Sequence, residues 1–555
     1  PASGLVFNTS FQFAASAWTD EDPPLLYAFS FVDGSSGTRM TVQSASEAPY
    51  GESVLPPGTA AVGSTMHMVT CSVAVFDALS AVATAERQVQ VTEWKGGSTT
   101  LAVTIAAQLD AGAGNMEVTR QVLVTGASVL NTVNCSAAPD CVILSRRVCS
   151  QTPHTCGPCL SGYVGDEGDA NSRCVPTSAV FSWTMSGSSS NTDVNANANV
   201  TEQSCSSTND CDIWSTCSGD GQCQRLLKQC IDPDCSGHGA CSFVNNLDGY
   251  VLVGGICRQG NSTCSAVCSC VDGFVGGDCS ATAAEMAAKQ QIRALLIASL
   301  GNLTQSEIPS GDNLVSWSNS LSALTQISEE VPRVSLDSIG AIVTTIVQRT
   351  ASSSDTVAAA EISGVVGALD IITQSLAKGD VSTVGQRRQL ATGGVGVISV
   401  STVVGLLTDY ISLVSREMLP GQSPIESIKA NFRLSSTAIS GGGGGGDGAD
   451  DGSMLVTPRT FAEIVGNTPA MEVMLPSGIV SDGANAGSDV IEVNSVVMDA
   501  ELFNSSAFFS NPMFITMSRS PCVSGVGVIA VAGSCRMNVT LRNNIAVPMD
   551  STDYS

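Results

Sequence analysis

The chain has 555 residues, of which 50 are acidic and 24 basic, so its net charge is −26. A chain of this length exceeds one hydrophobic core, and we expect several domains. The acidic excess excludes nucleic acid and anionic membrane surfaces as partners, because both require basic patches.

The chain begins without an initiator Met or a signal-like apolar run, so we expect a mature or internal fragment. Its longest apolar stretches are too short to cross a bilayer or carry a charge, which places any membrane anchor outside the fragment. Seven Asn-x-Ser/Thr sequons predict glycosylation on the extracellular side of a membrane. The candidate sites are Asn8, Asn134, Asn199, Asn261, Asn302, Asn504 and Asn538.

Residues 1–133 begin with β-strand patterns. The stretch MHMVTCSVAVFD at 66–77 alternates, with Val69, Cys71 and Val73 on one face. Similar stretches before and after it predict a β-sandwich of about 90 residues. Cys71 lies far from the other cysteines, and we interpret it as a buried free thiol. Residues 97–133 fit helix or strand equally well.

Residues 134–280 are rich in cysteine: 18 of the 21 cysteines lie between Cys135 and Cys279. Such density predicts disulfides in an oxidising compartment. The cysteines fall into three groups of even size, so each group can close on itself. The first is Cys135, Cys141, Cys149, Cys156, Cys159 and Cys174, the second is Cys205, Cys211, Cys217 and Cys223, and the third is Cys230, Cys235, Cys241, Cys257, Cys264, Cys268, Cys270 and Cys279.

One segment of the first group, Cys156-Gly-Pro-Cys159, has the spacing of a thioredoxin-type redox motif. A redox dithiol needs an exposed thiolate at a helix N-terminus that follows a core strand. Neither flank here predicts that junction, and four other cysteines crowd around the segment. We therefore expect Cys156 and Cys159 to be half-cystines. A secreted thiol oxidoreductase is the alternative, and a zinc site is disfavoured by the oxidising context.

Residues 281–420 lack cysteine and show helical periodicity. Apolar stripes predict packing faces. The residues that we expect to be buried in them are Ile292, Leu296, Val365, Leu369 and Leu407. The dibasic pair Arg387-Arg388 indicates either a linker between helices or a processing site.

Residues 421–555 return to strand patterns and predict a second β-sandwich. Cys522 and Cys535 flank a glycine-rich stretch, and we expect a disulfide that spans a hairpin. The run of six glycines and the acidic residues after it, 441–452, predict a solvated loop. Calcium is the only cofactor that we consider, and this loop is its candidate site.

Catalytic chemistry is not indicated. The chain has three histidines, His67, His154 and His238, and shows no P-loop, HExxH or nucleophile-elbow pattern. We predict a protein that is not an enzyme and has no catalytic, cofactor-binding or metal residues.

The third cysteine group, in residues 229–280, resembles an EGF-like module. The segments CIDPDCSGHGAC and CSCVDGFVGGDC carry the resemblance, and the second is similar to the closing hairpin of that family. The family's calcium signature before the first cysteine is missing. The resemblance implies the pairs Cys230–Cys241, Cys235–Cys268 and Cys270–Cys279. We pair the two cysteines left over, Cys257 and Cys264, as an inserted staple. Residues 134–228 are separate cysteine-rich modules.

The N-terminal region resembles the receptor-for-egg-jelly (REJ) region of polycystin-1-type proteins. The matching residues are Trp18, Asp20, Asp22, Pro23, Leu25 and Tyr27, followed by Leu55, Pro56 and Gly58. In that family a helical block and a β-sandwich form a GAIN domain before the membrane. The helical subdomain 281–420 and the sandwich 421–555 have that order. The tripeptide of the GAIN cleavage site is absent, so the resemblance does not imply autoproteolysis within the fragment.

The resemblances imply a multidomain, mixed fold: an N-terminal β-sandwich, a disulfide-rich EGF-like middle and a GAIN-like half in which a helical block precedes a β-sandwich. They also imply an ectodomain acting in adhesion, matrix tethering or force transmission. Its partners would be an extracellular protein or glycan ligand and, through a membrane part outside the fragment, a polycystin-2-type channel. The Ala- and Gly-rich composition favours a green-algal flagellar member. The alternative is a structural subunit of an extracellular filament (mastigoneme) or wall.

Overall fold

The computed structural model describes residues 3–441 apart from short gaps and two longer ones, 179–203 and 378–397. Beyond residue 441 it describes chiefly strands, the last of which ends at Leu541. Several sequence-based expectations lie outside the described residues. They concern the acidic loop, the dibasic pair, Cys522, the side chain of Cys535 and four of the sequons.

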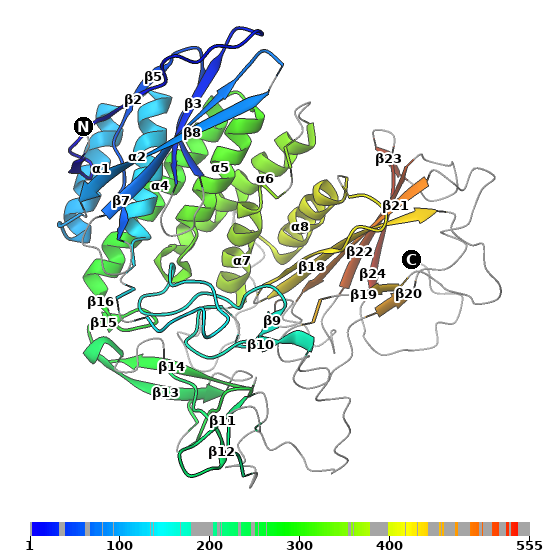
Figure 1. Cartoon of the computed structure of the whole chain (residues 1–555). Coiled ribbons are helices and arrows are strands. Elements are labelled where there is room, and N and C mark those ends of the chain that lie inside the picture. The colour runs from blue at the N-terminus through cyan, green and yellow to red at the C-terminus, as the bar shows by residue number, and fades with distance from the viewer. Residues whose placement is uncertain are drawn as a thin grey trace. The chain divides into compact units, whose positions relative to one another are not determined.

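The chain forms two compact units (Figure 1). Unit 1 contains the chain up to Glu307 and the returning segment Gln326–Pro332. Unit 2 contains Ile308–Thr325 and most of the chain from Arg333 onward. None of the helices among the described residues is long and apolar enough to cross a membrane.

The N-terminal part of unit 1 is built around a six-stranded sheet. In order across the sheet, its strands are β1 (Ser3–Leu5), β8 (Val82–Thr92), β7 (His67–Phe76), β3 (Leu26–Val32) and β4 (Arg39–Ser46), and β6 (Thr59–Ala60) also pairs with β7. Strands β1 and β8 are parallel, and the other pairs are antiparallel. A separate antiparallel pair is formed by β2 (Phe11–Ala14) and β5 (Tyr50–Ser53). The alternating pattern of 66–77 thus forms the central strand β7.

Helices supply the packing layer that we expected a second sheet to provide. They are α1 (Ser98–Ala111), α2 (Met116–Leu130) and, from much later in the chain, α4 (Ala283–Ser306). In Figure 1 these helices lie behind the strands of the sheet, and α2 packs against β4. The three helices meet at Gly126, where a Cβ would lie 3.1 Å from atoms of Ile105 and Leu296. The N-terminal region is therefore β-rich, but it is a sheet covered by helices rather than a simple sandwich.

The ambiguity of residues 97–133 is resolved by capping and burial. The side chain of Asn115 accepts hydrogen bonds from the backbone N–H groups of Glu117 and Val118, which starts α2. Helix α4 starts with a capping box between Thr282 and Glu285.

The middle of unit 1 has little regular structure. Its described residues contain four antiparallel pairs and one 3-10 turn, η2 (Cys235–Gly237). The pairs are β9 (Tyr163–Val164) with β10 (Val175–Pro176), β11 (Ser215–Cys217) with β12 (Cys223–Arg225), β13 (Gly239–Asn245) with β14 (Cys264–Cys270), and β15 (Phe274–Val275) with β16 (Ala281–Thr282).

Unit 2 combines helices with a second six-stranded sheet. The helices are α5 (Gly311–Leu324), α6 (Leu336–Ser352), which follows the 3-10 turn η4 (Arg333–Ser335), α7 (Gly364–Ala377) and α8 (Val400–Ser415). The strands, in order across the sheet, are β17 (Ile425–Ile428), β18 (Phe432–Gly441), β21 (Asp489–Met498), β22 (Met513–Ser520), β24 (Ser534–Leu541) and β23 (Ile529–Val531), and β19 (Met454–Val456) pairs separately with β20 (Glu472–Met474). Helix α8 packs on β18 and β21.

The apolar stripes are buried, as their periodicity predicts. Ile292, Leu296, Val365, Leu369 and Leu407 are each at most 1% exposed. The helical stretch 281–420 is nevertheless divided, because α4 packs on α1 and α2 of unit 1, whereas α5 to α8 belong to unit 2. A stripe predicts that a face is buried but does not identify its partner.

Candidate functional site in the cysteine-rich region

Nine disulfides lie in the described part of the chain, between Cys135 and Cys279, and each cysteine group closes on itself. The first group pairs Cys135–Cys149, Cys141–Cys156 and Cys159–Cys174, the second pairs Cys205–Cys217 and Cys211–Cys223, and the third pairs Cys230–Cys241, Cys235–Cys268, Cys257–Cys264 and Cys270–Cys279. The third set contains the pairs that the EGF-like resemblance implies, together with the inserted staple.

The segment with redox spacing holds two different bridges. Cys156 is joined to Cys141 and Cys159 to Cys174, so no dithiol is present. Cys156 is fully buried, and the residues after Cys159 form a turn and the short strand β9 rather than a helix. An exposed thiolate at a helix N-terminus is what redox chemistry requires. The geometry here is that of a structural staple.

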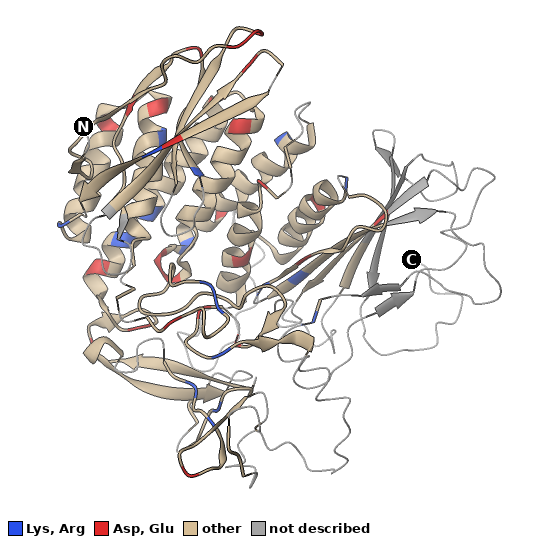
Figure 2. Cartoon of the chain, viewed as in Figure 1, with Lys and Arg blue, Asp and Glu red and all other residues tan. Residues whose placement is uncertain are grey.

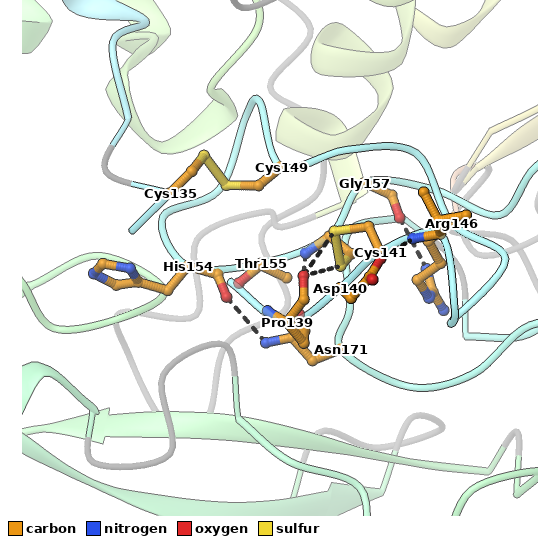
Figure 3. Close-up of a disulfide and its surroundings, with 12 residues drawn as sticks. Cys135, Pro139, Asp140, Cys141, Arg146, Cys149, His154, Thr155, Gly157 and Asn171 are labelled. Carbon is orange, nitrogen blue, oxygen red and sulfur yellow. Dashed lines mark hydrogen bonds between the residues drawn. A yellow bond between two sulfur atoms is a disulfide. The ribbon is translucent and has the colours of Figure 1, made fainter. Parts of the chain in front are cut away.

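The first cysteine group is organised around one buried guanidinium, that of Arg146, which is 1% exposed (Figure 3). Its Nε donates to the carbonyl of Ser172 at 2.5 Å. Its Nη1 donates to the carbonyls of Gly157 at 3.2 Å and Gly168 at 2.9 Å. Its Nη2 donates to the carbonyl of Asp166 at 2.9 Å and to Oγ of Ser172 at 3.2 Å. All five N–H groups of the guanidinium therefore have an acceptor.

This arrangement replaces an apolar core. Burial lowers the pKa of Arg146, and the nearby carboxylates of Asp166 and Asp169 oppose that shift. Burial likewise raises the pKa of Asp169. The loop carbonyls of residues 157–172 converge on a cation that the protein supplies itself. The planar guanidinium of Arg146 fixes these carbonyls in place, because it presents its N–H groups in set directions that a lysine ammonium could not reproduce.

A second buried cation joins the first cysteine group to the third. Nζ of Lys228 lies 2.5 Å from Oδ1 of Asp166 and donates to the carbonyl of Cys264 at 3.0 Å. Cys264 belongs to the third cysteine group, where it is bonded to Cys257. The first and third cysteine groups are thus bridged by Lys228, whereas the sequence predicts modules that are merely consecutive.

The third cysteine group contains the antiparallel pair of β13 with β14, and the Cys270–Cys279 bridge closes the turn that follows β14. The imidazole of His238 stacks on the ring of Phe274, with centroids 3.7 Å apart. At Gly239 a Cβ would lie 2.8 Å from Sγ of Cys279, so only glycine fits beside this disulfide.

Three sequons lie at described positions with a known environment. Asn8 and Asn302 are exposed. Asn261 is 3% exposed, and its Oδ1 accepts hydrogen bonds from the backbone N–H and the hydroxyl of Thr263. Asn261 therefore acts as the cap of a tight turn.

The free cysteine among the described residues is Cys71, on the central strand β7, and it is buried. Burial raises the pKa of its thiol to about 11. The interpretation of Cys71 as a buried free thiol is confirmed.

One group of exposed carboxylates could face a cation. Oxygen atoms of Asp20, Asp22 and Asp77 lie within 4.8 Å of one another. Oδ1 of Asp77 already accepts from the backbone N–H groups of Leu79 and Ala81, which accounts for its place in a turn. Figure 2 shows acidic and basic residues spread thinly over the coloured part of the chain.

Sequence reasoning missed the buried cations Arg146 and Lys228. A basic residue in a cysteine-rich loop is usually solvated, and the pattern around Arg146 gives no signal of burial. The only signal in the sequence was that basic residues are few, 24 in the whole chain.

A family model for the REJ domain matches residues 1–108. The match covers the six-stranded sheet and most of α1. A search of the curated proteins finds no match. The REJ domain is a family of extracellular-type regions of polycystin-1-like proteins and is not an enzyme family. An extracellular region agrees with the N-terminal β-rich part and the many disulfides that follow it.

Proposed function

We propose that the chain is an extracellular part of a polycystin-1/REJ-like membrane protein. It acts in adhesion, matrix tethering or force transmission at the plasma or ciliary membrane. Its outer surface binds an extracellular protein or glycan, and its membrane part, outside this fragment, associates with a polycystin-2-type channel. The observation that carries the proposal is the REJ match over residues 1–108.

The cysteine-rich region supports the location. Nine bridges form stably only in an oxidising compartment. The contact of Lys228 with both Asp166 and Cys264 supports a mechanical role, because it ties the first disulfide-bonded group to the third.

The test uses the full-length protein with a tag in its native cell. A membrane-impermeant biotin reagent should label it on intact cells, and a polycystin-2-type channel should co-purify with it in mild detergent. The control is a version that lacks residues 1–108. If the shortened protein no longer binds matrix at the cell surface but still co-purifies with the channel, the binding is assigned to the REJ region.

The opposite result is equally informative. A protein that stays in a detergent-insoluble filament fraction and never co-purifies with a channel would contradict the proposal. That result would favour the structural filament subunit.

A further inference from the structure

The segment Gln326–Pro332 belongs to unit 1 although the chain before and after it belongs to unit 2. Its 3-10 turn η3 (Ser328–Glu330) carries two adjacent glutamates. Glu330 is 3% exposed, whereas Glu329 is exposed. The segment therefore inserts one carboxylate into unit 1 and leaves its neighbour at the surface.

Glu330 is held by two cations of α4. Its Oε1 accepts from Nζ of Lys289 at 2.8 Å. Its Oε2 accepts from Nε of Arg293 at 2.9 Å and from Nη2 at 2.6 Å. The guanidinium of Arg293 is fully buried and also donates to Oδ1 of Asn131 at 2.8 Å. Asn131 is the C-cap of α2, so this network joins the segment to α4 and α2.

Burial lowers the pKa of Arg293, and the charge of Glu330 opposes that shift. The pair thus depends on both partners. Removal of the Glu330 charge would take away the carboxylate that faces the buried Arg293 guanidinium, which is far more costly than the loss of an exposed pair.

Glu329 reaches the EGF-like module. Its Oε2 accepts from the backbone N–H of Gly277 at 3.0 Å. Gly277 lies in the turn closed by Cys270–Cys279. The carbonyl of Glu329 also accepts from Nε2 of Gln290 on α4 at 2.9 Å. Two consecutive residues therefore contact the closing turn of the EGF-like module and the helix that follows it.

We propose that residues 326–332 form a strap that fixes the joint between the EGF-like module and helix α4, and that its release converts this joint into a hinge. The strap continues directly into unit 2 at both ends, through Thr325 and Arg333. Movement of those segments is the input that the strap would transmit to the joint. The inference concerns contacts within unit 1 and does not depend on the proposed function.

The test compares two neighbouring substitutions in the full chain by hydrogen exchange. Glu330→Gln removes the buried charge and nearly preserves the shape. Exchange in 326–332 and in the turn 271–282 should rise roughly a hundredfold or more. Helices α1 and α2 should keep their protection, and disulfide mapping should return all nine bridges. Glu329→Gln weakens the strap's own contact with Gly277 and should raise exchange in the turn 271–282 alone. Glu47→Gln, at an exposed position of unit 1 outside the strap, is the control and should change neither segment.

A second measurement reports the joint itself. Spin labels on unnatural amino acids at Val267 and Ala113 give a distance distribution between the EGF-like hairpin and the helices. This distribution should broaden in Glu330→Gln and stay narrow in the control Glu47→Gln. An unchanged distribution in Glu330→Gln would overturn the proposal, as would a loss of protection spread evenly over unit 1. A misfolded variant would be recognised by altered bridges, and Arg293→Lys, which keeps the charge, would then serve in its place with a smaller broadening expected.

Discussion

At the scale of single residues, buried cations do the work that apolar side chains do in larger domains. Small cysteine-rich modules have too little interior for a hydrophobic core. In the first cysteine group Arg146 collects four loop carbonyls and one hydroxyl, so the loops are tied to one point in addition to their bridges.

We expect Arg146→Lys to destabilise the module by about 2–4 kcal/mol, because an ammonium offers three donors where the guanidinium offers five and leaves buried carbonyls unpaired. Arg147→Lys is the matched control, since Arg147 is exposed. Limited proteolysis within residues 135–177 measures the difference. Equal resistance of the two variants would show that the bridges alone hold these loops.

Cys71 gives a pH-dependent prediction. Its pKa is raised to about 11 by burial, so the thiol stays protonated well above the pH at which an exposed cysteine ionises. In the native chain Cys71 should resist iodoacetamide at pH 8 and react only after unfolding. The raised pKa contributes stability that is fully present below the pKa of the unfolded thiol and is lost as the pH rises toward 11. Rapid native labelling at pH 8 would contradict this burial. The Cys71→Ala variant identifies the labelled site.

At the scale of elements, periodicity was sufficient to predict which helical faces are buried. Leu369 on α7 and Leu407 on α8 are both fully buried. The sequence did not allow their partners to be predicted, and α4 illustrates why. Its stripe resembles those of α5 to α8, yet its surroundings are α1 and α2, some 150 residues earlier in the chain, because Gly126 leaves room for Leu296 there.

We expect Leu369→Ala to cost about 2–5 kcal/mol through the cavity that it leaves in unit 2. Hydrogen exchange should show loss of protection in α5 to α8 and β18, while α4 and the disulfide-bonded hairpin β13–β14 are unchanged. Ser375→Ala on the same helix, at a half-buried position, is the control. Loss of protection in α4 as well would mean that the two units unfold together.

The candidate site was likewise predictable from the sequence only in part. The grouping of cysteines could be inferred from spacing, since a stapled module requires an even count. The role of Glu330 could not, because an acidic pair in a turn normally faces solvent. Its burial depends on Lys289 and Arg293, some 40 residues earlier, and such a pairing has no local signature.

At the scale of the whole molecule, each of the two units is stabilised internally by different interactions. The described disulfides all lie in unit 1, between the helical layer of α1 and α2 and the start of α4. The sheet and helices of unit 1 have their own apolar core, including Ile105, Leu123 and Leu296. In the described part of unit 2 the helices pack through buried apolar stripes, and Ser415 on α8 adds hydrogen bonds to Glu492 and Asn494 of the sheet.

Mild reduction of the full chain should therefore act selectively. Cleaving the bridges removes the main constraint on residues 135–279, since modules of this size do not fold on apolar burial alone. Exchange protection and protease resistance should be lost there, whereas β3, β7 and helices α1, α2 and α4 keep theirs. Helices α5 to α8 should keep their protection too. The unreduced chain is the reference, and the Cys71→Ala variant separates any effect of that thiol. If α5 to α8 lost protection at the same reductant concentration as β13 and β14, the helices of unit 2 would depend on the cysteine-rich region, and the independence of the two units would be wrong.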